Sequence, residues 1–117
     1  MPYAHLNPKV AAGLRAMEPR EAVETAIKLT ASLVAGVAFI GFNLDKQHPI
    51  NRAIIDLIAW VNQHADNETV SLEDLIALLE RVCFQIWRLA AFQSGDNKLR
   101  LIELVDVIST KPNIMLG

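Results

Sequence analysis

Residues 29–44, LTASLVAGVAFIGFNL, contain no Lys, Arg, Asp, Glu or His. A helix that is apolar on every side has to be buried on every side. The segment is shorter than the about 20 residues that a membrane-spanning helix needs, and Lys28 and Asp45 border it. We therefore expect a buried helix inside a small globular protein, with a membrane-associated helix over residues 26–44 as the less favoured alternative.

The whole chain is rich in apolar residues for its size. Its 117 residues suit one domain, so we predict a single helical domain over residues 1–117. Apolar residues make up 52% before Gly is counted, whereas a typical soluble domain has about 45–50% with Gly included. Because a small domain has a limited interior, some of these side chains should lie in a self-association surface, a partner surface or a pocket.

Charge and cysteine content exclude or favour several classes of protein. The net charge is −2, and the 11 basic residues are scattered along the chain. Nucleic-acid binders need a concentrated basic face, so we predict no nucleic-acid partner. Cys83 is the single cysteine, which excludes an intramolecular disulfide and fits a reducing compartment. The N-terminus, MPYAHLNPKV, lacks the pattern of a secretory signal peptide. The sequence therefore predicts a cytoplasmic protein.

Helix start and stop signals divide the chain into five segments. Asn7 followed by Pro8 is typical of a helix N-terminus. Ser71 with Asp74 three residues later is a variant of the capping box, with Val70 available for a hydrophobic staple, and Gly95 suits the end of that helix. The predicted helices cover residues 8–17, 19–42, 49–64, 71–93 and 96–111, the last with Asp96 as its cap.

The apolar residues of these segments recur at helical spacing, and no strand pattern competes. Because the connections are short, successive long helices should pack antiparallel. We predict an all-α fold, a compact antiparallel bundle of about five helices with the second and fourth as its two long central members. The predicted core stripes are Ile50, Ile54, Leu57, Ile58 and Val61; Leu72, Leu75, Leu79, Val82, Ile86 and Leu89; and Leu101, Leu104, Val105 and Ile108.

Small residues punctuate the second helix, and Ser32, Ala35 and Gly36 are the candidates for close helix packing. Small side chains let another helix backbone approach closely. That neighbour is either a helix of the same chain or a helix of a second subunit, and the sequence leaves both open.

Aromatic side chains at or beyond the edge of the predicted core stripes mark a candidate partner surface. On the fourth helix, Phe84 lies well outside the stripe and Trp87 widens it. Phe39 and Phe42 fall on the side of the second helix that is polar in its first turns, where either the N-terminal segment, residues 3–17, or a second subunit covers them. Phe84, Trp87, Arg88 and Ala91 form the main candidate, since aromatic residues and Arg are enriched at protein interfaces. The alternative is that the first or fifth helix of the same chain covers them.

No pattern in the chain predicts catalysis, a cofactor or a metal ion. His5, His48 and His64 are far apart, and Cys83 has no Cys or His close to it in sequence. We interpret Cys83 as a core residue and Glu80 and Arg81 as ordinary surface charges.

The predicted function is a small protein-interaction module that acts through an apolar helix surface and self-associates as a homodimer. An adaptor, an inhibitor or an assembly factor would fit. The alternatives are a small-ligand-binding protein or enzyme, with a pocket between helices walled by Trp60 or Trp87, and the membrane-associated helical protein named above.

Overall fold

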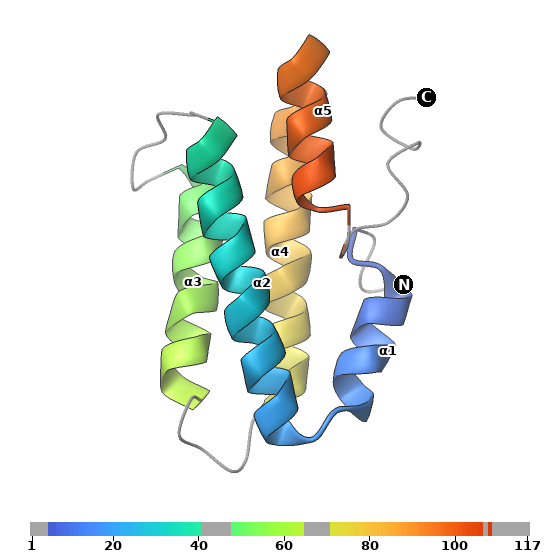
Figure 1. The fold of residues 1–117 in the computed structure, drawn as a ribbon, viewed down its shortest axis with the longest axis vertical. Helices are drawn as coiled ribbons and strands as arrows, with labels where there is room; N and C mark the ends of the chain where they lie inside the picture. Colours follow the sequence, from blue (N-terminus) through green and yellow to red (C-terminus); the bar gives the residue numbers. More distant parts are fainter. Residues whose placement is uncertain (1–4, 41–47, 65–70, 107, 109–117) are drawn as a thin grey trace.

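The computed structural model describes residues 5–40, 48–64, 71–106 and 108, and for residues 38–40 the backbone alone. Five helices follow one another along these residues, and they form no β-strand (Figure 1). The all-α prediction is confirmed. The helices are α1 (Pro8–Ala16), α2 (Pro19–Ile40), α3 (Pro49–His64), α4 (Leu72–Ala91) and α5 (Gly95–Leu104).

Four of the helices pack in a ring. The second helix, α2, packs against α3 and α5, and α4 packs against the same two helices. The first helix, α1, packs against α4 on the outside of this ring, at the right of the view in Figure 1. The two longest helices, α2 with 22 residues and α4 with 20, therefore occupy opposite corners of the bundle.

The core lies inside this ring and continues under α1. Most of its residues belong to the predicted stripes, because a 3-4 spacing places them on one face of each helix. Ile58 is an exception, since it was predicted for the core stripe of α3 but is 36% exposed. Leu6, which precedes the first helix and belongs to no predicted stripe, is also completely buried. The largest side chains with less than 2% exposure include Leu14, Leu33, Ile50, Leu57, Leu75, Ile76, Leu79, Ile86 and Leu101.

The predicted capping interactions at the helix ends are confirmed in part. The Asn7 side chain accepts a hydrogen bond from the Lys9 N–H (2.9 Å), as the N-cap pattern predicts. Ser71 occupies the N-cap of α4 but makes no side-chain cap hydrogen bond, so its half of the predicted capping box is not formed. Its carbonyl oxygen accepts a bond from Trp60 Nε1 instead (3.2 Å). The staple residue Val70 lies outside the described residues.

The fifth helix begins and ends earlier than predicted. Ser94, rather than Asp96, is its N-cap. Gly95 has φ +60°, a backbone conformation that glycine adopts without a steric cost, so the chain reverses there between α4 and α5. The helix ends at Leu104, and Val105 and Ile108 beyond it are buried as the predicted stripe requires.

The uncharged half of α2 is not buried on all sides, and that expectation is wrong for the single chain. Thr30, Leu33 and Val37 face the core. Ala31 and Val34 are exposed on the other side of the same helix turns. The reason is the ring itself, because α2 packs against α3 and α5, whereas the described helix outside the ring, α1, packs against α4.

Candidate functional site

The predicted aromatic surface of α4 divides into exposed and buried residues. Phe84 is 41% exposed, and Arg88 and Ala91 are exposed beside it on the same helix face. Trp87 is only 8% exposed and belongs to the core. Three of the four predicted residues are thus accessible to a partner, and for Trp87 the structure favours the alternative in which the same chain covers it.

The segment that precedes α1 contributes to the cover over Trp87. The His5 ring meets Phe84 edge-on at 5.1 Å between centroids and Trp87 at 6.0 Å. Leu6 follows and is completely buried. Aromatic pairs at such distances are favourable in edge-to-face geometry, so this segment is a specific part of the fold.

Glu80 anchors the same segment and is the residue that sequence reasoning missed. The His5 N–H lies 3.1 Å from Oε1 and 3.0 Å from Oε2 of Glu80, and the Leu6 N–H donates to Oε2 at 2.6 Å. His5 Nδ1 lies 2.8 Å from Oε1, and because a carboxylate can only accept, that nitrogen is the donor. The Glu80 side chain is only 16% exposed. The expectation that it is an ordinary surface charge is therefore wrong.

Arg81, by contrast, is an exposed residue as predicted. It forms an ion pair with Asp56 of α3 at 2.9 Å, and both side chains are about half exposed. Ion pairs of this kind contribute about 0–1 kcal/mol to stability, because solvent screens them.

Two of the predicted partner residues cannot be placed in this way. Phe39 lies within α2, but its side chain is outside the described part of the structure. Phe42 lies in the segment 41–47, which is also outside it. Their assignment to a partner surface stays a prediction.

The candidates for close helix packing separate in the same manner. Gly36 lies directly against α5, and a Cβ atom added there would overlap the Leu104 side chain. Ser32 and Ala35 are exposed. The close approach at Gly36 is thus between two helices of one chain. Of the two alternatives that the sequence left open, this is the one in which the neighbouring helix belongs to the same chain.

A second apolar area lies where α2 and α3 meet the solvent. Ile27 and Val34 are 45% and 42% exposed, and they project from the edge of α2 opposite Gly36, which faces α5. Because α2 packs between α5 and α3, this is the edge toward α3. On α3, Ile58 is 36% exposed and Ile55, one turn earlier, is 50% exposed. We call these four side chains the α2–α3 apolar surface.

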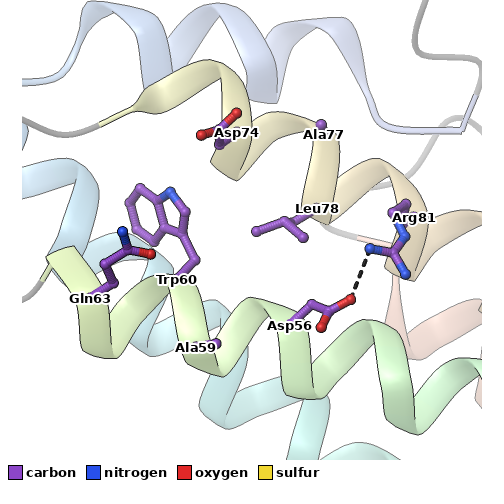
Figure 2. A pocket seen from close by; sticks show the side chains of 8 residues that line it. All are labelled: Asp56, Ala59, Trp60, Gln63, Asp74, Ala77, Leu78 and Arg81. Carbon is purple, nitrogen blue, oxygen red and sulfur yellow. Dashed lines mark hydrogen bonds and ion pairs between the residues drawn. The ribbon is translucent and has the colours of Figure 1, made fainter.

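A groove of about 370 Å³ lies on the other side of α3, between α3 and α4. Figure 2 shows Trp60 and Leu78 on its apolar part, the Asp56–Arg81 ion pair toward one end, and Asp74 toward the other. Ala59, Gln63 and Ala77 complete its lining. The alternative ligand-binding interpretation predicts a pocket between helices walled by Trp60 or Trp87, and this groove lies between two helices with Trp60 in its lining.

Trp60 is held rigidly at this groove. Its Nε1 donates to the Ser71 carbonyl, and its ring stacks on His64 at 4.4 Å. His64 Nδ1 lies 2.9 Å from the Trp60 carbonyl oxygen. These contacts account for the buried position of His64, and they leave one edge of the indole to line the groove.

The chemistry of Cys83 agrees with a packing role. It is completely buried, and burial together with the nearby charge of Glu80 raises the pKa of its thiol to about 12. The thiolate is the nucleophilic form, so Cys83 is unreactive in the folded protein near neutral pH. Among residues 5–40, 48–64, 71–106 and 108, no three His, Cys, Asp or Glu side chains are grouped as metal ligands.

None of the described helices combines the length and the hydropathy that a membrane crossing requires. Comparison of the chain with protein-family models, with curated proteins and with solved structures finds no match.

Proposed function

We propose that this protein is a small cytoplasmic protein-interaction module that self-associates as a homodimer through the α2–α3 apolar surface. The observation that carries the proposal is the exposure of Ile27 and Val34 on the edge of α2 toward α3, together with the exposure of Ile55 and Ile58 on α3, which packs against α2. A two-fold axis brings the same patch of both copies together, so an apolar patch is complementary to itself. The role of such a dimer is that of an adaptor, an inhibitor or an assembly factor.

The size of this surface predicts a weak dimer. Complete burial of one Ile or Val side chain is worth about 1.5–3 kcal/mol, and these four are already between 36% and 50% exposed. Each therefore contributes about 1 kcal/mol on association. Two copies of the patch therefore contribute about 8 kcal/mol, against an association cost whose lower end is about 4 kcal/mol. At that lower cost the dimer has a Kd of about 1 mM, so it should form in a concentration-dependent manner.

The exposed aromatic end of α4 supplies a second contact area for a different protein. Phe84, Arg88 and Ala91 lie on one face there, and Phe92, at the end of the helix, is 81% exposed. Aromatic and Arg side chains at the centre of interfaces carry much of the binding energy. This area supports the adaptor role, in which the dimer holds a further partner.

The test compares two single-charge variants by sedimentation velocity at one high concentration. Ile55→Glu introduces a charge into the α2–α3 apolar surface, whereas Asn97→Glu introduces the same charge at an exposed position of α5. We expect Ile55→Glu to sediment as the monomer and Asn97→Glu to retain the behaviour of the unmodified protein. Equal sedimentation of both variants and the unmodified protein would refute the assignment of this surface.

The groove between α3 and α4 favours a second candidate function, the binding of a small molecule with an apolar body and a cationic group. Trp60 and Leu78 offer the apolar contact, and Asp74 offers a carboxylate. Benzylamine is a suitable probe, because the Trp60 fluorescence reports its arrival. We expect the fluorescence change to saturate with benzylamine concentration, and the binding to be weaker in Asp74→Asn than in the unmodified protein. A fluorescence change that rises linearly with benzylamine concentration in both proteins would exclude this candidate.

A further inference from the structure

The segment before α1 is held in an extended form by contacts with its backbone. Glu80 accepts the N–H groups of His5 and Leu6, and the Asn7 N–H donates to the Ile108 carbonyl oxygen at 2.8 Å. Three successive backbone donors are therefore satisfied by residues at least 74 positions later in the sequence. Charge-assisted bonds to a carboxylate are about twice as strong as neutral ones.

The side chains of the same segment are recognised as well. Leu6 is completely buried, and the His5 ring lies edge-on to Phe84 and Trp87. Backbone bonds that give affinity, combined with pockets that select side chains, are how proteins recognise extended peptides. We call Glu80, Phe84 and Trp87 the socket. It has the chemistry of a peptide-docking site, and residues 5–7 of the same chain fill it.

The filled socket belongs to an arm that packs mainly along one helix and is joined to the segment after α5 by the Asn7–Ile108 backbone bond. This N-terminal arm, residues 5–16, has α4 as its main packing partner. Arg15 pairs with Glu73 of α4 at 2.7 Å, and Glu73 lies seven residues, or about two helical turns, before Glu80 on the same face. The arm thus runs along α4 in the opposite direction, from Glu80 to Glu73.

A short connection joins the arm to the rest of the chain. Met17, the C-cap of α1, has extended backbone angles (φ −79°, ψ 150°), and Glu18 separates it from Pro19, the first residue of α2. An element with one main neighbour and a short linker is the kind of unit that identical chains exchange, since the exchanged pair keeps every native contact.

We propose that the socket is an exchangeable docking site whose second occupant is the N-terminal arm of another copy of this chain. A chain's own arm competes for its socket at an effective concentration in the millimolar range. Exchange in the unmodified protein therefore requires a protein concentration above this millimolar value. At lower concentrations it is favoured only where one chain has lost its socket and the other its arm contacts. The proposal rests on the proposed function in that its partner is a second copy, and it makes no use of the α2–α3 apolar surface.

The experiment mixes two variants of the full chain, each damaged on one side of the contact. The first carries Glu80→Ala, which breaks the socket, and the second carries Leu6→Asp, which breaks the arm. Both also carry Ile27→Glu and Ile55→Glu, so that association through the α2–α3 apolar surface is removed. Far-ultraviolet circular dichroism checks that each remains helical, and Leu6→Ala replaces Leu6→Asp if the latter does not fold.

The readout is the molar mass by light scattering of each variant alone and of the equimolar mixture. We expect monomers alone and a one-to-one dimer in the mixture, because the free arm of one chain enters the empty socket of the other. A mixture that keeps the monomer mass would overturn the exchange, whatever the α2–α3 apolar surface does in the unmodified protein.

A peptide measurement tests the socket directly. A synthetic peptide of residues 1–9, MPYAHLNPK, is titrated into the Leu6→Asp variant with Trp fluorescence as the signal. We expect binding that is at least tenfold weaker when Glu80→Ala is added, and weaker also for the same peptide with Asp in place of Leu6. Equal binding to both proteins would overturn the assignment of Glu80 as the anchor.

Discussion

The contact between Gly36 and Leu104 gives the sharpest test of how α2 and α5 pack. Replacing Gly36 by Ala favours the helix by about 1 kcal/mol. The new methyl group overlaps the Leu104 side chain, and overpacking of this kind costs about 1–3 kcal/mol. We therefore expect Gly36→Ala to lower the free energy of unfolding by about 0–2 kcal/mol, measured by urea denaturation followed by circular dichroism.

The sign should reverse when the overlapping side chain is removed. In a Leu104→Ala background, Gly36→Ala should raise the free energy of unfolding by about 1 kcal/mol, since the helix gain remains and the overlap is gone. The double-mutant cycle then gives a coupling of about 1–3 kcal/mol. Gly13→Ala is the matched control, because nothing lies within 4 Å of its added Cβ, and it should stabilise by about 1 kcal/mol in either background. If Gly36→Ala stabilised as much as Gly13→Ala in both backgrounds, the described helix contact would be incorrect.

Three further predictions concern the core and the turn after α4. The pKa of the Cys83 thiol is raised from 9.0 to about 12, so the unfolded chain loses the thiol proton at a lower pH than the folded protein does. Between these two pH values the free energy of unfolding should fall by about 1.4 kcal/mol per pH unit. If Cys83→Ala showed the same dependence of the free energy of unfolding on pH, this prediction would be contradicted. Trp87→Ala should cost about 3–5 kcal/mol in urea denaturation because Trp87 is buried, whereas Phe92→Ala, at an 81% exposed position, should change stability by less than about 0.5 kcal/mol; equal costs would refute the burial pattern. Gly95→Ala should cost about 1–2 kcal/mol because φ is +60° there, and a thermal denaturation midpoint at or above that of the unmodified protein would be inconsistent with it.

The helices and their core faces could be predicted because they depend on local patterns. The stripe from Leu75 to Ile86 repeats at helical spacing, so its inward face follows from geometry alone. The Asn7 cap is local in the same sense, since its hydrogen-bond partner is two residues away. The Ser71 cap shows the limit, because the pattern placed the residue correctly but not its side-chain hydrogen bond.

The arm and its socket could not be predicted in this way. Glu80 and His5 are 75 residues apart, and neither stands in a motif that announces a partner. The sequence pattern does not distinguish a carboxylate such as Glu80, which is partly buried and accepts backbone N–H groups, from an exposed charge on a helix face. Leu6 was missed for the related reason that it precedes the first helix and belongs to no periodic stripe.

The interpretation of α2 failed for a different reason. The absence of charge over residues 29–44 predicts an apolar surface, and Ala31, Val34 and Ala35 are exposed in its described part, but the pattern does not indicate whether the same chain or another copy covers them. In the bundle, one chain supplies two neighbours for α2 and leaves Val34 exposed. The sequence pattern and the exposed side together lead to the proposal that a second copy completes the burial.

The molar mass of the unmodified protein in solution, measured across a dilution series, tests that proposal most directly. We expect 13.0 kDa at the lowest concentrations and a rise toward twice that value as the concentration increases. A mass of 13.0 kDa at every concentration would contradict the claim that the apolar side of this bundle binds a second copy.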